Sequence, residues 1–250
     1  MNINLQGKTA LVTGASGQLG RVMARSFAAA GADVIVHYAK SKAMAESLAA
    51  EIVKMGRRVL PIQADITDIS SVNNMRDIIA RDFRLPDIVV NNAVIQYTWK
   101  SILEQDPADF QSQFASCVLQ SVLTAKAFIP EMINRGGGRF IGINTETTAL
   151  CHAGTGAYAA GKCGMDGLYR VLAKEVGESA VTVNQVAPGW TISDRDREQG
   201  TTEAPEYTGS VPLARRGTDV EVAQMVLFIA SDLASYITGA HIPVSGGRVC

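Results

Sequence analysis

Long hydrophobic runs, a leader pattern and a surplus of one charge sign are all missing from this chain of 250 residues. No apolar run approaches the roughly 18 residues that a membrane-spanning helix needs. Residues 1–8 lack the basic region followed by an apolar one that marks a signal peptide. The net charge is −1 and no basic stripe is present, which argues against nucleic acid as a partner. We therefore expect a cytoplasmic protein with neither a membrane nor a nucleic-acid partner.

Cysteine is scarce, with four residues at positions 117, 151, 163 and 250 and no Cys-x-x-Cys pair. This usage is typical of reduced thiols in a cytosolic protein. The pair Cys151-His152 has no second pair at metal-ligand spacing, so no metal site is predicted. Reactive-thiol chemistry at Cys117 or Cys163 stays open as a remote alternative.

Short apolar runs rich in β-branched residues alternate with longer helical patterns along the whole chain. Continuous apolar runs indicate strands buried on both faces of a parallel sheet. Predicted strands cover residues 9–12, 34–36, 59–62, 88–90, 140–143, 181–186 and 242–244. Predicted helices cover residues 19–30, 42–54, 70–83, 108–134, 158–176 and 219–229. The alternation predicts one α/β domain over residues 1–250, a three-layer doubly wound Rossmann fold with a mostly parallel seven-stranded sheet and helices on both faces.

A glycine-rich stretch follows the first predicted strand, where ligands of such sheets bind. Glycines allow backbone N–H groups to approach a pyrophosphate, and the next helix adds its positive N-terminal end. The alternative is a purely structural turn. The candidate phosphate-binding residues are Gly14, Ser16, Gly17, Gln18, Leu19 and Gly20.

The second predicted strand ends without the acidic residue that usually binds the ribose 2′-hydroxyl of NAD. Its end reads His37-Tyr38-Ala39-Lys40-Ser41. Lys40 and Ser41, with Tyr38 beside them, offer groups for a 2′-phosphate, which favours NADP(H) over NAD(H). The alternative is that Lys40 is only a solvated surface charge.

A phenol and an ammonium lie four residues apart at Tyr158 and Lys162. This spacing puts both side chains on one helix face. The cation favours the phenolate form, which suits proton transfer to or from an alcohol. Thr145 ends a predicted strand 13 residues earlier and brings a hydroxyl to the same region. Tyr38 and Lys42 share the spacing but lack this context.

Taken together, these motifs resemble the short-chain dehydrogenase/reductase family in its single-domain form, over essentially the whole chain. The resemblance includes Asn91-Asn92-Ala93, the stretch 184–189 and the late segments 212–217 and 237–239. It extends broadly to 3-oxoacyl-[acyl-carrier-protein] reductases. It implies cofactor contacts from Asp65, Ile66, Asn92, Ala93, Lys162, Pro188, Gly189 and Thr191.

The resemblance also implies a chemistry. Tyr158 is the general acid or base for a carbonyl or alcohol, as hydride moves from or to nicotinamide C4. Lys162 promotes proton transfer by Tyr158 and binds ribose, and Thr145 polarises the substrate oxygen. Thr147, His152 and Trp190 are the candidate substrate residues, and residues 190–215 form an expected lid of polar character. Its charges face either solvent or substrate.

Four positions depart from the family pattern. Gln18 stands where the family has a glycine, Val94 replaces the last glycine of Asn-Asn-Ala-Gly, and Thr145 replaces a serine. Cys117 takes the place of a helix asparagine that supports a proton relay, and a thiol is a weak hydrogen-bonding group.

The sequence thus predicts an NADP(H)-dependent oxidoreductase acting on a small carbonyl or secondary alcohol. The alternative is a catalytically weak NADP-binding sensor or structural protein of the same fold. The helical stretches 108–134 and 158–176 correspond to those that pair between subunits in relatives, so a homotetramer is expected, with a dimer as the alternative.

Overall fold

A computed structural model describes residues 3–249, so Cys250 lies outside the described part of the chain. Seven parallel strands form the central sheet in the order β3-β2-β1-β4-β5-β6-β9. Their bounds are β1 Thr9–Val12, β2 Asp33–Tyr38, β3 Val59–Gln63, β4 Ile88–Asn91, β5 Gly138–Ile143, β6 Val181–Pro188 and β9 His241–Val244. The predicted doubly wound fold with a seven-stranded parallel sheet is confirmed.

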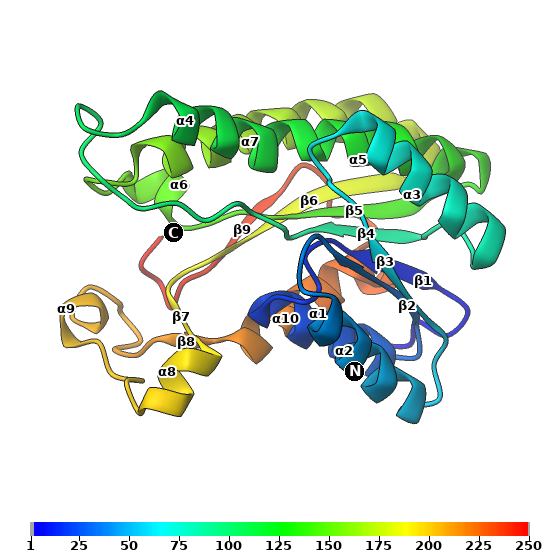
Figure 1. The fold of residues 1–250 in the computed structure, drawn as a ribbon, viewed down its shortest axis with the longest axis horizontal. Helices are drawn as coiled ribbons and strands as arrows, with labels where there is room; N and C mark the ends of the chain where they lie inside the picture. The colour runs from blue at the N-terminus through cyan, green and yellow to red at the C-terminus, as the bar shows by residue number, and fades with distance from the viewer. Residues whose placement is uncertain (1–2, 250) are drawn as a thin grey trace.

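Helices cover both faces of this sheet (Figure 1). One face carries α1 (Gln18–Ala29), α2 (Lys42–Lys54) and α10 (Asp219–Ala230). The other carries α3 (Ile69–Asp82), α4 (Pro107–Phe114), α5 (Gln120–Asn134) and α7 (Gly156–Val176). Alternate strand residues feed two separate cores: Ala10 and Val12 belong to the first, and Leu11 to the second. This is why the strands read as continuous apolar runs.

The helix predicted over residues 108–134 is wrong as a single α-helix. The π-helical segment Ala115–Leu119 separates α4 from α5. A π-helical segment adds about one residue to a helical turn, and the hydrophobic spacing of the sequence does not reveal this addition. Such segments often occur at functional sites. The hydroxyl of Ser121 bonds the carbonyl of Cys117 at 2.9 Å, so buried polar side chains help to satisfy the irregular backbone.

Short elements that the sequence did not predict lie near the carboxyl ends of the strands. They are α6 (Thr147–Leu150), β7 (Thr191–Ile192), α8 (Asp194–Gln199), α9 (Pro205–Thr208) and β8 (Gly217–Thr218). Two 3-10 turns, Gly177–Ser179 and Asp232–Ala234, lie at the opposite edge of the sheet, where they follow α7 and α10. Strands β7 and β8 pair in parallel, so residues 190–218 project from the sheet as a folded segment (Figure 1). Within residues 3–249, no helix has the length and apolarity to cross a membrane.

The sheet order changes direction between β1 and β4, which continue to β2 on one side and to β5 on the other. In doubly wound sheets, ligands bind in the crevice beyond the strand ends at such a point. The loops after β1, β4 and β5 therefore define where a site is expected.

Candidate active site

The loop between β1 and α1 is tied to the end of β4. The Thr13 hydroxyl accepts the backbone N–H groups of Asn92 and Ala93 at 2.9 and 3.1 Å, and the Asn92 amide donates to the Thr13 carbonyl at 2.9 Å. Gly14 has a left-handed φ of +62°, and a Cβ at Gly20 would lie only 2.4 Å from the Gly14 carbonyl oxygen. These positions need glycine so that the backbone turns tightly at the N-terminus of α1. The loop between β1 and α1, residues 13–17, thus forms a cradle suited to phosphate and is called here the phosphate loop.

The His37 side chain bonds this loop to the neighbouring strands of the sheet. Its Nδ1 accepts the Gly14 N–H at 3.0 Å, and its Nε2–H donates to the carbonyl of Ala64, also at 3.0 Å. The ring is fully buried, and this burial lowers the pKa of His37 from 6.5 to about 4. A neutral imidazole thus joins β2, β3 and the phosphate loop. From the sequence, His37 is only part of a strand end, because nothing in the pattern distinguishes a buried crosslink from a polar strand terminus.

We predict that His37 makes the stability of the fold dependent on pH. The unfolded chain takes up a proton as the pH falls below about 6.5, whereas folded His37 stays neutral until about pH 4. The free energy of unfolding should therefore decrease over this window, by up to about 3 kcal/mol from this group. Denaturant unfolding of the wild type and of His37→Gln, which offers the same acceptor and donor without titrating, measures the difference. Equal losses in the two proteins on acidification would contradict the role given to His37.

A long groove with a volume of about 1120 Å³ runs from the phosphate loop along the strand ends. Nearly all the predicted cofactor residues line it, namely Gly14, Ser16, Gly17, Gln18, Leu19, Gly20, Lys40, Ser41, Asp65, Ile66, Asn92, Ala93, Lys162, Pro188 and Gly189. Tyr38 and Thr191 do not: Tyr38 is buried in the core beneath α2, and Thr191 lies in β7 with its carbonyl bound by Arg216. The long groove therefore lies where the carboxyl ends of the strands predict a ligand-binding site.

The long groove also contains a hydroxyl that was not among the predicted cofactor residues. Ser116, on the π-helical segment, lines the groove, and its buried hydroxyl has no partner among the described residues. Asp65 is the only acid among the described lining residues. Hydrogen bonds from the Thr67 hydroxyl and N–H lower the pKa of Asp65, so its carboxylate is already engaged. Near Lys40 and Ser41 the wall of the groove therefore offers a cation and a hydroxyl, and no acidic side chain from β2 lines it.

Tyr158 and Lys162 lie side by side in the first turns of α7. The Lys162 Nζ is 5.7 Å from the centre of the Tyr158 ring and donates to the carbonyl of Ile143 at 2.6 Å. Lys162 is only 3 % exposed, so its charge acts in a poorly solvated setting. The Asn144 amide joins β5 to the Lys162 carbonyl at 3.2 Å. This contact fixes α7 against the strand that carries Thr145.

Thr145 faces the same region from the end of β5. It is 8 % exposed, and its hydroxyl lies 3.2 Å from both the Thr147 hydroxyl and the Thr147 N–H. Thr145 and Tyr158 line the long groove and also a second cavity beside it, together with Val94, Ile95, Gln96 and Gly189. A molecule in the groove and a molecule in the second cavity would thus meet at a hydroxyl and a phenol.

Cys117 lies near this region without lining either cavity. It is fully buried within the core cluster beneath α7. A Cβ built on Gly161 would lie 3.3 Å from Cys117 Sγ, so the thiol packs closely against the helix that carries Tyr158. Burial raises the pKa of the Cys163 thiol, which weakens the reactive-thiol alternative at that residue.

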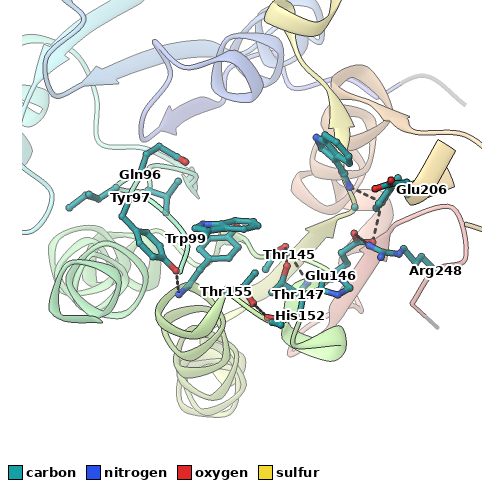
Figure 2. Close-up of a pocket in the computed structure, with 17 residues that line it drawn as sticks. Gln96, Tyr97, Trp99, Thr145, Glu146, Thr147, His152, Thr155, Glu206 and Arg248 are labelled. Carbon is teal, nitrogen blue, oxygen red and sulfur yellow. Dashed lines mark hydrogen bonds and ion pairs between the residues drawn. The ribbon is translucent and has the colours of Figure 1, made fainter. Parts of the chain in front are cut away.

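The second cavity, called here the aromatic pocket, has a volume of about 670 Å³. All three predicted substrate residues, Thr147, His152 and Trp190, line it. Figure 2 shows Tyr97 and Trp99 on one side, Glu206 and Arg248 on the other, and Thr145 between them. The Tyr97 hydroxyl accepts the backbone N–H of Tyr158 at 2.8 Å, which holds this wall of the pocket against α7.

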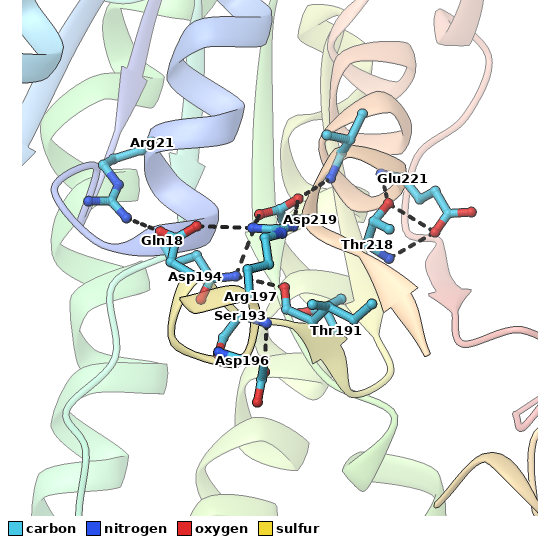
Figure 3. A network of polar contacts seen from close by, with 12 residues as sticks. Gln18, Arg21, Thr191, Ser193, Asp194, Asp196, Arg197, Thr218, Asp219 and Glu221 are labelled. Carbon is cyan, nitrogen blue, oxygen red and sulfur yellow. Dashed lines mark hydrogen bonds and ion pairs between the residues drawn. The ribbon is translucent and has the colours of Figure 1, made fainter. Parts of the chain in front are cut away.

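Among the charges of the expected lid, Glu206 lines the aromatic pocket and most of the others are exposed, but Asp194 and Arg197 bond to neighbouring helices. They form a network with α1 and α10 (Figure 3). Arg21 pairs with Asp194, and Arg197 pairs with the buried Asp219 at 2.7 Å. Gln18 donates to the carbonyl of Ile192 at 2.9 Å. The residue that breaks the expected glycine pattern thus anchors the segment after β6 onto the phosphate loop.

Comparisons with known proteins agree with this geometry. Residues 14–248 match the family described as Enoyl-(Acyl carrier protein) reductase. The chain is 38 % identical to a 3-oxoacyl-[acyl-carrier-protein] reductase FabG of Pseudomonas aeruginosa, and 36 % identical to one of Staphylococcus aureus. The first match covers 98 % of both chains, and the second covers 96 % of this chain and 97 % of the relative.

Solved structures are similar over the same length. A Serratia marcescens short-chain dehydrogenase/reductase mutant superposes with a TM-score of 0.91 at 31 % identity, covering 98 % of this chain and 99 % of the other. A blue fluorescent protein from a metagenomic library, in complex with NADPH, gives 0.91 at 32 % identity over 99 % and 100 %. With the parallel sheet, the phosphate loop and near-complete coverage in agreement, the chain belongs to the short-chain dehydrogenase/reductase family of oxidoreductases.

Proposed function

We propose that this protein is an NADP(H)-dependent reductase that transfers hydride between the nicotinamide and a carbonyl or secondary alcohol. The observation that carries this proposal is that Thr145 and Tyr158 line both the long groove and the aromatic pocket. Cofactor and substrate placed in the two cavities would therefore meet at an acid-base group and a hydrogen-bond donor.

The groove fits a dinucleotide on grounds of shape and chemistry. It combines a glycine cradle at a helix N-terminus, the unpartnered hydroxyl of Ser116 and the cation of Lys40. When bound, the nicotinamide supplies or accepts hydride at C4. The NADPH complex of the metagenomic relative supports the choice of nicotinamide cofactor.

Each residue then has a role that matches its position. Tyr158 donates a proton to the carbonyl oxygen during reduction and takes one from the alcohol in the reverse direction. Lys162 places its positive charge 5.7 Å from the Tyr158 ring centre in a buried setting and presents its ammonium to ribose hydroxyls. Thr145 donates a hydrogen bond to the oxygen as negative charge develops.

Absorbance of NADPH in the presence of a carbonyl panel tests the proposal. The panel contains β-ketoacyl thioesters, sugars and aromatic ketones, and we expect oxidation of NADPH with at least one class. Tight NADPH binding without turnover on any member would overturn the enzyme assignment. That result would favour the alternative of a cofactor-binding sensor or structural protein.

Lys40 is the residue that we propose selects NADP(H). Lys40→Ala should raise the KM for NADPH about tenfold and leave that for NADH nearly unchanged, because only NADPH carries the 2′-phosphate and a hydrogen bond to a charged group contributes about 1.5–3 kcal/mol. Lys42→Ala is the matched control, since Lys42 pairs with Glu46 at 3.6 Å and does not line the groove. Equal changes for both cofactors in Lys40→Ala would refute the assigned selectivity.

A homotetramer is part of the proposal. Apolar side chains stand exposed on α4 and α7, where Phe114 is 58 % and Val171 is 54 % exposed. Pairing these helices between copies would cover both residues. Light scattering on the purified protein distinguishes a tetramer from a dimer.

A further inference from the structure

Aromatic residues are concentrated in the aromatic pocket. They make up 6 % of the chain but five of the seventeen residues that line this cavity. Both tryptophans of the protein and three of its six tyrosines are there: Tyr97, Trp99, Tyr158, Trp190 and Tyr207. Such a concentration is not explained by core packing, because most of these rings keep a free surface.

The two tryptophans present open rings from different segments. Trp99 is 56 % exposed and comes from the loop after β4, whereas Trp190 is 52 % exposed and follows β6. Trp99 stacks on Tyr158 with ring centres 6.1 Å apart and an interplanar angle of 25°. A flat ring that enters beside Tyr158 would therefore continue an existing stack. Large apolar surfaces left bare around a cavity are typical of ligand sites.

The Trp190 wall is held in place before any ligand binds. Trp190 packs edge-on against Tyr207 at 5.4 Å, and the Arg216 guanidinium covers its ring at 4.3 Å. The Tyr207 hydroxyl donates to Glu146 at 3.2 Å and accepts the backbone N–H of Trp190 at 2.8 Å. Burial raises the pKa of Tyr207, so its phenol stays neutral. A wall fixed in this way lowers the entropy cost of ordering side chains on binding.

The charges of the pocket favour an uncharged occupant. Arg248 is the one Lys or Arg among its described lining residues, and it pairs with the buried Glu146 at 2.6 Å. Glu206 adds a second carboxylate on the same side (Figure 2). A negatively charged occupant would thus meet two carboxylates and a single cation that is already paired. A neutral, flat molecule meets no such penalty.

We infer that the aromatic pocket selects ketones that carry a flat aromatic ring system, which Trp99 and Trp190 bind while the carbonyl faces Thr145 and Tyr158. This inference rests on the proposed carbonyl reduction and adds its substrate class. Ring stacking contributes about 0.5–1.5 kcal/mol per pair beyond area burial. Each tryptophan therefore supplies a preference for aromatic over saturated rings of about two- to tenfold.

The test compares 2-tetralone with 2-decalone, its saturated equivalent of the same two-ring skeleton, and with an acetoacetyl thioester. We expect kcat/KM with NADPH to be about tenfold or more higher for 2-tetralone than for 2-decalone. Trp99→Leu and Trp190→Leu should each reduce that ratio about two- to tenfold. Tyr236→Leu, at a fully exposed tyrosine outside the pocket, should leave it unchanged. Equal rates for the two ketones, or a preference for the thioester, would overturn the inference.

A binding measurement separates this inference from the proposed function. The alcohols 2-tetralol and 2-decalol have no carbonyl to reduce, so calorimetric titration with NADPH present reports binding alone. Tighter binding of 2-tetralol than of 2-decalol, together with no turnover of any ketone, would support the aromatic pocket and overturn the reductase assignment. Turnover of ketones without tighter binding of 2-tetralol would support the reductase assignment and overturn the inference about the aromatic pocket. No binding of either alcohol up to its solubility limit would overturn the inference.

Discussion

Tyr158→Phe is expected to lower kcat for carbonyl reduction about 10²–10⁴-fold, the range that a positioned proton donor contributes. The substitution removes only the phenol oxygen. The backbone N–H of Tyr158 still bonds Tyr97, and the ring still stacks on Trp99. The wall of the aromatic pocket and the start of α7 are thus preserved. The loss should appear in kcat, while the dissociation constant for NADPH stays within about twofold of wild type.

Tyr236→Phe provides the control for this experiment, since Tyr236 is fully exposed and lines neither cavity. Its kcat should match that of the wild type. If Tyr158→Phe retained more than about a tenth of the wild-type kcat, Tyr158 would not be the proton donor.

Thr145→Val is expected to lower kcat about 10²-fold, and Thr145→Ser only a few-fold. Valine keeps the branched shape of this nearly buried side chain, so the space that Thr145 fills stays occupied. What is lost is the hydroxyl that would donate to the substrate oxygen, and removal of one such donor costs about 10²–10³ in kcat. Serine restores the donor without the methyl group.

The comparison of these two variants separates chemistry from structure. A purely structural role for the Thr145 hydroxyl, through its contacts with Thr147 at 3.2 Å, would lower the unfolding temperature of Thr145→Val without a specific fall in kcat. That outcome, or equal rates for Thr145→Val and Thr145→Ser, would contradict the role assigned to Thr145.

Much of the fold was predictable because its signals are local. Five of the seven sheet strands are short, largely buried runs, and only the edge strands β3 and β9 are partly exposed. Each long helix except one has the expected period. The exception is the stretch 108–134, where the π-helical segment Ala115–Leu119 shifts the register of the backbone. That shift arises from tertiary contacts and polar side chains beneath α7, which hydrophobic spacing does not record.

Candidate site residues were predictable where a motif fixes them to a strand end or a helix start. The long groove includes the predicted glycines, Asp65, Asn92 and Lys162. Other roles depend on partners distant in the chain. Gln18 bonds Ile192, 174 residues away, and His37 bonds Gly14 and Ala64. Cys117 stands at a family position yet packs in the core. Such pairings become visible only once the strands are placed.

Direct hydride transfer between molecules in the two cavities is the central step of the proposed function. The measurement that tests it follows the label when NADPH deuterated at nicotinamide C4, on one face or the other, reduces 2-tetralone or another accepted ketone. With the label on one of the two faces, we predict one deuterium on the carbinol carbon of the product and none lost to water. With the label on the opposite face, deuterium should remain on the oxidised cofactor. A product that carries solvent hydrogen at that carbon with both labels would contradict the account.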